Sequence, residues 1–322
     1  MNVLVITGLT LPEVTEEDRD MIVAAGGPGT KVTVVSKVRD AIEHAATTDV
    51  VLGIMPEPLF AAAPNLKWVH ASASGVDMFM YPAFRDSPIP LSGEKGLVGG
   101  HLADHGFGLL LALTRRIATA IRLGPEAWAH REELRVTELE LEGLTMGIFG
   151  FGGTGRAAAR RAEAFGMRLI AMDELPVPPS DGVTEVWPTT RLKEMLGQSD
   201  VVAICCPLTD ATRLLFDDRV FGQMKRGALL VNVTRGEVVD DDAMVRALQS
   251  GQLGGAALDV VNGEPIAPDH PLWSFENVVM TPHTAGASQH RARRNFERFC
   301  DNLRRFQAGG PLVGVIDKQA GF

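Results

Sequence analysis

The sequence has few cysteines and no long hydrophobic run. Only Cys205, Cys206 and Cys300 occur among 322 residues. This number excludes a disulfide framework or a zinc site built on paired cysteines, so we expect no metal and a reducing, cytoplasmic environment. The longest apolar run, Gly106 to Leu113, is far shorter than the ~20 residues that span a bilayer. The first residues, MNVLVITG, lack the basic segment and cleavage site of a signal peptide, so we do not expect export.

Clusters of basic residues are also absent. The chain has 31 Lys and Arg against 40 Asp and Glu, a formal net charge of −9, and no stretch gathers the positive charge. This balance argues against nucleic acid or an anionic membrane as a partner. Glycine, in contrast, is abundant, with 34 residues, as in the strand–helix turns of α/β folds. At roughly 100–200 residues per domain, the length predicts two domains.

The first hundred residues alternate short apolar runs with helical patterns. We expect strands at Val3–Ile6, Lys31–Val35, Val50–Ile54, Lys67–His70 and Ile89–Leu91, and helices at Glu16–Ala25 and Arg39–Ala46. Uninterrupted apolar strands separated by helices predict a doubly wound parallel sheet. A long helix buried on several sides is expected over 102–123, followed by a polar arm over 124–145.

A second strand–helix alternation begins at Met146. The expected strands are Met146–Phe149, Arg168–Met172, Val201–Cys205, Leu229–Val233, Ala256–Asp259 and Val278–Thr281. The expected helices are Arg156–Phe165, Arg191–Leu196, Arg219–Gln223, Asp241–Ser250 and, at the end, an amphipathic Gln289–Gln307. Six parallel strands with right-handed crossovers predict a Rossmann sheet that binds a dinucleotide.

A glycine-rich loop, GFGGTG, joins the first strand of this second alternation to its helix. Gly150 allows a tight turn, Gly152 lets the backbone approach a pyrophosphate, and Gly155 lets helix and strand pack closely. With Gly153 and Thr154 they surround a helix N-terminus, whose N–H groups favour phosphate. The next strand ends in Asp173, at the ~20-residue separation expected for an acid that binds the adenosine ribose. Because that acid repels a 2′-phosphate, we expect NAD over NADP; a methyltransferase is the competing interpretation.

Three later strands are each followed by charged or titratable residues: Arg235, Glu264 and His283. Because ligands bind outside the carboxyl ends of the strands, we expect these residues to converge. A histidine has an ordinary pKa of ~6.5 and can supply a proton to a carbonyl oxygen. Glu264 can hold the imidazole, and the planar fork of Arg235 can bind a carboxylate. The combination predicts reduction of a 2-keto acid by a nicotinamide.

The chain resembles the D-isomer-specific 2-hydroxyacid dehydrogenases. The resemblance is carried by GIFGFGGTGRAAARRAEAFGMRLIAMD, CPLTDATRLLFD, MKRGALLVNVTRGEVVDDDAMVRAL, AALDVVNGEP and PHTAGAS, in the order found in the family. It implies that Arg235, Glu264 and His283 are catalytic. It further implies a set of cofactor contacts: Cys206, Pro207 and Thr212 beside the adenosine, and Val233, Thr234 and Asp259 near the nicotinamide.

The resemblance also implies the domain organisation. A flavodoxin-like substrate domain would comprise 1–99 and 288–322, with the Rossmann NAD-binding domain, 100–287, inserted in it. The loop SASGVD would hold the substrate carboxylate through Ser74, Gly75 and Val76, together with Arg235 and His283. The family also suggests a homodimer, which the long apolar helix and the arm around Trp128 favour.

Some positions depart from the family pattern. The start of the interdomain helix contains His101, Asp104 and His105; Asp104 keeps the charge of the family's residue on a shorter side chain, and for the two histidines we expect surface polarity. Met55 and Glu57 lie where the family forms its substrate pocket. These positions differ among relatives, so they do not identify the substrate. Glyoxylate and hydroxypyruvate are plausible substrates, and Glu264 disfavours formate oxidation because relatives with that activity carry Gln there. Two alternatives remain: an NAD(H)-sensing regulatory protein on the same fold, and oxidation of another small anion such as phosphite.

Overall fold

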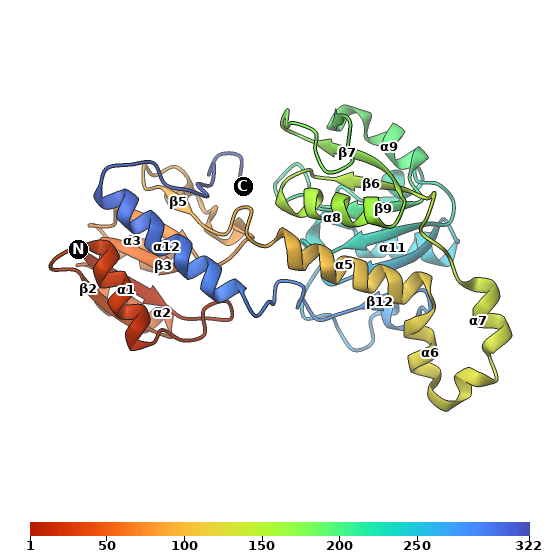
Figure 1. Cartoon of the computed structure of the whole chain (residues 1–322), viewed down its shortest axis with the longest axis horizontal. Coiled ribbons are helices and arrows are strands. Elements are labelled where there is room, and N and C mark those ends of the chain that lie inside the picture. Colours follow the sequence, from red (N-terminus) through yellow and green to blue (C-terminus); the bar gives the residue numbers. More distant parts are fainter. The chain divides into compact units, whose positions relative to one another are not determined.

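The computed structural model describes residues 1–322 as two compact units. Unit 1 comprises Met1–Val98 and Ala287–Phe322, and unit 2 comprises Gly99–Gly286. The chain therefore leaves unit 1 once and returns to it, as the red, orange and blue parts of Figure 1 show. The division falls one residue before each of the expected boundaries. That unit 1 takes the substrate and unit 2 the cofactor stays a prediction.

Unit 1 contains a parallel sheet in the order β2-β1-β3-β4-β5. Its strands are β1 (Asn2–Ile6), β2 (Lys31–Val35), β3 (Val50–Gly53), β4 (Trp68–Ala71) and β5 (Leu91–Ser92). Its helices are α1 (Glu16–Gly26), α2 (Val38–Ala45), α3 (Glu57–Ala61), α4 (Pro82–Arg85) and α12 (Arg291–Gln307), with a 3-10 turn η1 (Asp77–Phe79). This is the flavodoxin-like strand order: β2 is added on one side of β1, and the later strands β3, β4 and β5 are added on the other side.

Two hydrophobic layers cover the two faces of this sheet. On one face, Trp68 of β4 stacks on Phe299 and Phe306 of α12, with ring centroids 5.3 and 5.7 Å apart, and Ile22 of α1 joins the same layer. On the other face, α2, α3 and α4 contribute buried side chains, among them Phe84 of α4. Because α12 supplies a large part of one layer, one face of the unit 1 sheet is covered in part by the returning C-terminal segment.

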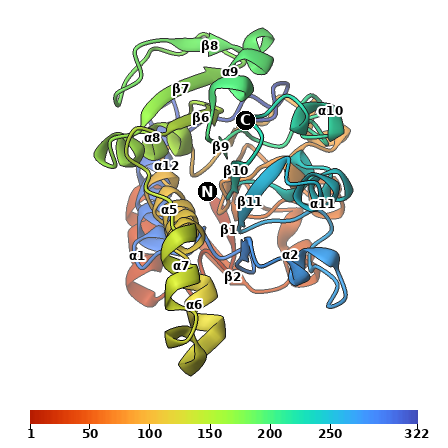
Figure 2. The same ribbon diagram turned by 90° about the vertical axis from the view of Figure 1, so that its right-hand side faces the viewer.

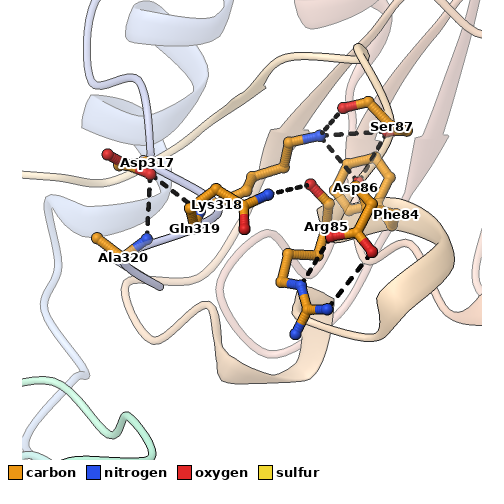
Figure 3. Close-up of polar contacts among 8 residues, drawn as sticks. All are labelled: Phe84, Arg85, Asp86, Ser87, Asp317, Lys318, Gln319 and Ala320. Carbon is orange, nitrogen blue, oxygen red and sulfur yellow. Dashed lines mark hydrogen bonds and ion pairs between the residues drawn. The ribbon is translucent and has the colours of Figure 1, made fainter.

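The chain ends in a segment, residues 316–322, that we call the C-terminal strap (Figure 3). Lys318 Nζ donates hydrogen bonds to the carbonyl oxygens of Phe84 and Ser87, at 2.8 and 2.7 Å. The same ammonium group lies 4.7 Å from the centre of the Phe84 ring. Asp317 Oδ1 accepts the N–H groups of Gln319 and Ala320, which folds the strap on itself. The strap thus fastens the end of α4.

Unit 2 contains a seven-stranded parallel sheet in the order β12-β11-β10-β9-β6-β7-β8. Its strands are β6 (Thr145–Phe149), β7 (Arg168–Asp173), β8 (Val186–Pro188), β9 (Val201–Ile204), β10 (Ala228–Asn232), β11 (Leu253–Leu258) and β12 (Val278–Met280). The expectation of six strands was wrong, because β8 is a short, partly exposed edge strand that ends in proline and gives little apolar signal. The strand order is that of the Rossmann fold, with one further strand at the end.

Helices cover both faces of this second sheet. The helices of unit 2 are α5 (Gly99–Thr114), α6 (Ile117–Leu123), α7 (Arg131–Thr137), α8 (Gly153–Ala164), α9 (Leu192–Gln198), α10 (Asp218–Phe221) and α11 (Asp241–Gln249). The 3-10 turns are η2 (Gly124–Trp128), η3 (Thr189–Arg191), η4 (Gly236–Val238) and η5 (Pro271–Ser274). The expected fold class, two doubly wound parallel sheets, is confirmed. None of the helices has the length and apolar character needed to cross a membrane.

The single long helix expected over 102–123 is two helices in the structure. α5 ends at Thr114, and Arg116 adopts a left-handed backbone conformation with φ of 53° before α6 begins. The apolar residues of α5 are largely buried within unit 2, whereas α6, η2 and α7 expose theirs. These three elements form an arm that projects from the rest of unit 2 (Figure 2).

Candidate active site

The carboxyl ends of the unit 2 strands lie at one edge of the sheet, since all seven are parallel. The glycine-rich loop follows β6 there. Gly150 has a φ of +99°, and a Cβ at this position would lie 2.6 Å from the backbone N of Cys206. A Cβ at Gly155 would lie 2.1 Å from the Gly150 oxygen, whereas one at Gly152 would meet nothing within 4 Å. The first and last glycines are therefore required by packing, and the middle one leaves space beside the backbone.

The helix N-terminus beside Gly152 has the chemistry of an anion site. Gly152 is the N-cap of α8, and it provides no side-chain hydrogen bond to the first turn. The N–H groups of Gly153, Thr154 and Gly155 therefore belong to the uncapped end of a helix, where partial positive charge favours an anion. The chemistry of this cradle and the close packing around it match what a bound pyrophosphate requires.

Asp173, the last residue of β7, is fixed by backbone donors on two sides. Its Oδ2 accepts the N–H of Phe151 in the glycine-rich loop at 2.7 Å, and its Oδ1 accepts the N–H of Leu175 at 3.0 Å. An ionised carboxylate has about four acceptor positions, so each oxygen can accept one further bond. Asp173 is therefore a rigid acceptor beside the loop, and its contact with a ribose stays a prediction.

The residues expected beside the adenosine form the turn after β9. Cys206 is buried in the hydrophobic core, and burial raises the pKa of its thiol. Thr212 is also buried; its Oγ1 donates to the Pro207 oxygen and accepts the Thr209 N–H, both at 2.8 Å. The side chains of Cys206 and Thr212 thus shape the turn, and the backbone of Cys206 lies against Gly150. Direct cofactor contacts of this turn stay a prediction.

The turn after β10 presents Arg235. Buried Asn232 organises it: its Oδ1 accepts the N–H of Thr234 at 3.1 Å, and its Nδ2 donates to the Arg235 oxygen at 2.9 Å. Val233 is buried, Thr234 is half-buried, and the Arg235 guanidinium donates to the Thr234 oxygen at 2.9 Å. The hydrogen bond from Asn232 therefore holds the backbone of Arg235 in place.

The expected acid–base pair is present in the turns after β11 and β12. His283 Nδ1 lies 2.6 Å from Glu264 Oε2. The side chains of His283 and Glu264 are 45% and 34% exposed, respectively, so the pair can reach a ligand. Glu264 engages one ring nitrogen and leaves Nε2 as the nitrogen that can exchange a proton with a substrate. His283 has a left-handed backbone with φ of 54°, which is uncommon for a residue other than glycine and is found often at functional sites.

A buried network below His283 includes a residue that the sequence interpretation missed. Asp259, almost fully buried, accepts the N–H groups of Thr284 and Ala285 at 2.9 and 2.8 Å. Thr281 Oγ1 donates to Asp259 at 2.7 Å, and His105 Nε2 lies 2.7 Å from the same Thr281 oxygen. His105 belongs to α5 and is thus more than the surface polarity expected for it. Asp259 holds the turn that carries His283, while its contact with a nicotinamide stays a prediction.

Asp104, another polar residue of α5, has a structural partner. Asp104 forms an ion pair with Arg161 of α8, with 2.7 Å between the two side chains, so it fastens α5 to α8. His101 lies one turn earlier, in the first turn of α5. The departures from the family pattern at this helix thus include at least one contact that stabilises unit 2.

The expected substrate loop lies in unit 1, after β4. Ser74 is exposed and Gly75 half-buried, whereas the side chain of Val76 is buried in the core. Val76 could therefore face a ligand only through its backbone. The role of all three residues stays a prediction. Met55 is buried in the same core, and its carbonyl oxygen accepts a hydrogen bond from Tyr81 Oη at 2.8 Å. Glu57 is exposed in the first turn of α3.

Comparison with known proteins identifies the family. Residues 107–285 match the family described as D-isomer specific 2-hydroxyacid dehydrogenase, NAD binding domain. The chain is 35% identical over 304 residues to a glyoxylate reductase of Korarchaeum cryptofilum, covering 91% of this chain and 87% of that protein. It is 30% identical over 268 residues to a hydroxypyruvate reductase of Blautia hydrogenotrophica, covering 82% of each.

A solved structure has the same fold along the whole chain. It is the NADPH-dependent glyoxylate/hydroxypyruvate reductase of Sinorhizobium meliloti in complex with NADP and sulfate, with a TM-score of 0.82, 28% identity and coverage of 100% of this chain and 99% of that one. The resemblance drawn from the sequence motifs is thereby confirmed. The chain belongs to the D-isomer-specific 2-hydroxyacid dehydrogenase family and is an oxidoreductase of that class, with a domain for a nicotinamide cofactor.

Proposed function

We propose that the protein interconverts a small 2-keto acid and its D-2-hydroxy acid with NAD as cofactor. The observation that carries this proposal is the pair formed by His283 and Glu264, with 2.6 Å between Nδ1 and Oε2, at the sheet edge that also carries Arg235 and the glycine-rich loop. A paired histidine, a guanidinium and an anion-binding helix N-terminus are the groups that reduction of a keto acid needs.

Each of these groups has one task. A nicotinamide, when bound, would supply the hydride chemistry at the substrate carbon. His283 gives a proton from Nε2 to the carbonyl oxygen during reduction and takes it back during oxidation. Glu264 keeps the imidazole oriented and stabilises its protonated form. Arg235 binds the substrate carboxylate through its planar fork and polarises the neighbouring carbonyl. In unit 1, Ser74, Gly75 and the backbone of Val76 would offer N–H groups to a carboxylate.

Asp173 supports NAD as the cofactor. Its carboxylate is fixed by two backbone N–H groups, and Glu174 follows it directly. Two acids at this place would repel the additional phosphate of NADP. The Sinorhizobium protein and a relative from Xanthobacter autotrophicus are described with NADP and NADPH, so cofactor preference is a property to measure on this chain.

Small substrates are supported by the relatives named glyoxylate reductase and hydroxypyruvate reductase. The direct test is a steady-state assay with NADH and a panel of 2-keto acids that includes glyoxylate, hydroxypyruvate, pyruvate and phenylpyruvate. We expect turnover with the smaller acids and a loss of about 10²–10⁴-fold in His283→Ala. A wild-type rate no higher than that of His283→Ala would contradict the enzymatic proposal and favour a binding protein on this fold.

We also propose a homodimer in the cytoplasm, with the arm of α6, η2 and α7 as its interface. Ile121, Trp128 and Val136 on this arm are 74, 81 and 82% exposed, and apolar side chains of this size are usually covered at interfaces. Light scattering after size exclusion tests the dimer: we expect twice the chain mass for wild type and the monomer mass for Ile121→Glu. A monomeric wild type at micromolar concentration would refute it.

A further inference from the structure

The turn that carries Glu264 is held by a carboxylate of the neighbouring helix. Asp241 Oδ2 accepts the N–H of Asn262 at 3.1 Å. Within the turn, Glu264 Oε1 accepts the N–H of Val261 at 3.1 Å, while its Oε2 faces His283. A chain of contacts therefore runs from Asp241 through the turn to the acid–base pair, with every residue in unit 2.

The segment that leads from Arg235 to Asp241 contacts the Glu264 turn at a second place. Gly236, which directly follows Arg235, lies so close that a Cβ there would be 1.9 Å from the carbonyl carbon of Val261. Residues 236–241 thus contact the turn through the backbone at one end and through Asp241 at the other. Arg235, which binds the substrate carboxylate in the proposed function, and Glu264, which orients His283, therefore lie in two segments that contact each other directly.

Asp241 is not needed to cap its own helix. Asp240 is the N-cap of α11, and its side chain accepts the Ala243 N–H at 3.1 Å. Asp241 is only 8% exposed, and its Oδ1 is buried without a hydrogen-bond partner. Burying a carboxylate with an unsatisfied oxygen opposes folding, so the helix alone does not account for an acid at this position.

The environment of Asp241 changes the pKa of its carboxyl group. Burial is the main cause that raises its pKa to about 7; the Asn262 hydrogen bond lowers this pKa, and the charges of Asp240 and Asp242 add to the increase. Perturbed carboxylates of this kind are enriched at functional sites.

We propose that Asp241 is a positioning residue that, through the N–H of Asn262, holds the turn in which Glu264 is oriented towards His283. This inference deepens the proposed function and depends on it for its effect on catalysis. Asp241 itself touches neither substrate nor cofactor in this scheme. Its removal would let the turn move, and small displacements of catalytic groups reduce turnover strongly.

The experiment compares Asp241→Ala, Asp241→Asn and the control Asp242→Ala, which removes the adjacent exposed acid. We expect Asp241→Ala to lower kcat by about 10- to 100-fold, with KM for NADH changed by less than about twofold. Asp241→Asn keeps an oxygen that can accept the Asn262 N–H, so it should restore most of kcat. Asp242→Ala should equal wild type. Equal kcat in Asp241→Ala and Asp242→Ala would overturn the proposal.

Two NMR measurements make the test independent of the assay. In wild type, the Asn262 amide should exchange with solvent much more slowly than an open turn amide; fast exchange would overturn the proposal even if Asp241→Ala does not fold. The ring ¹⁵N signals of His283 should shift in Asp241→Ala and stay unchanged in Asp242→Ala. If wild type has no turnover with any keto acid but these signals behave as expected, the proposed function fails and the positioning contact stands.

Discussion

His283 Nδ1 lies 2.6 Å from Glu264 Oε2, although the two residues belong to different turns at the carboxyl edge of one sheet. Each turn has its own buried support. Asp259 accepts two backbone N–H groups of the His283 turn, and Asp241 accepts one of the Glu264 turn. The geometry of the pair therefore depends on buried carboxylates that do not belong to it.

Replacing Glu264 by Gln should separate charge from shape at this pair. Gln keeps an oxygen that can accept the His283 N–H but no longer stabilises the charged imidazole. We expect kcat for keto-acid reduction to fall by about 10- to 100-fold, while the NADH dissociation constant stays within about twofold of wild type. Glu276→Gln, at an exposed position, is the control. Unchanged kcat in Glu264→Gln would remove the carboxylate from the mechanism.

Replacing His105 by Ala should weaken the support of the His283 turn. The change removes the hydrogen bond between His105 Nε2 and Thr281 Oγ1, which also donates to Asp259. We expect the free energy of unfolding to decrease by about 1 kcal/mol and kcat to fall more than affinity for NADH does. Urea denaturation and stopped-flow turnover measure the two effects. His44→Ala, at an exposed position of unit 1, serves as the control, and an effect no larger than this control would count against the network.

Replacing Asp173 by Asn should reduce discrimination between the two nicotinamide cofactors. Asn can accept one of the N–H groups of Phe151 and Leu175, but its amide group then faces the other donor. We expect the ratio of kcat/KM for NADH over NADPH to fall by about tenfold or more, as one charge near the ribose is removed. A wild type that prefers NADPH would contradict the role assigned to Asp173.

Sequence patterns predicted the strands with long apolar runs, because parallel strands buried on both faces have uninterrupted hydrophobic sequences. They failed where the burial is partial or the backbone is unusual. β8 is a short edge strand that ends at Pro188, and α5 ends where Arg116 adopts a left-handed conformation that no local glycine announces. At the end of α5 the Arg116 side chain donates a hydrogen bond to Thr137 of α7, a contact that no local sequence pattern reveals.

The site was predicted unevenly for a similar reason. Arg235, Glu264 and His283 follow strands directly, so the parallel topology alone brings them to one edge. His105 meets Thr281 across 176 positions of sequence, which no local pattern reveals. Asp241 left a weak signal: it lies three residues before Met244 and seven before Leu248, on the buried face of α11. Among three consecutive acids, this helical spacing could have identified the buried one.

Replacing Lys318 by Met should destabilise unit 1. Met preserves much of the apolar stem but removes the hydrogen bonds from Nζ to the oxygens of Phe84 and Ser87 (Figure 3). Hydrogen bonds from charged groups contribute about 1.5–3 kcal/mol, so we expect a loss of roughly 1–3 kcal/mol in the free energy of unfolding. Lys37→Met, at an exposed position of the same unit, should change it little. Similar unfolding curves for the two variants would show that the C-terminal strap does not stabilise α4.

Acidification should destabilise unit 1 through His70. This side chain is fully buried, with Nδ1 2.7 Å from Ser92 Oγ, and burial lowers its pKa from 6.5 to about 3, with the charge of Arg298 as a further cause. Between these two values the unfolded chain binds a proton that the folded chain excludes, so stability falls as pH decreases from about 6.5. The expected slope from this residue approaches about 1.4 kcal/mol per pH unit. Denaturation of wild type and His70→Gln at pH 7.5 and 5 measures it: the variant should be less stable at pH 7.5 but lose less stability on acidification. His44→Gln, at an exposed position, should follow wild type, and equal pH dependence in all three proteins would refute the assignment.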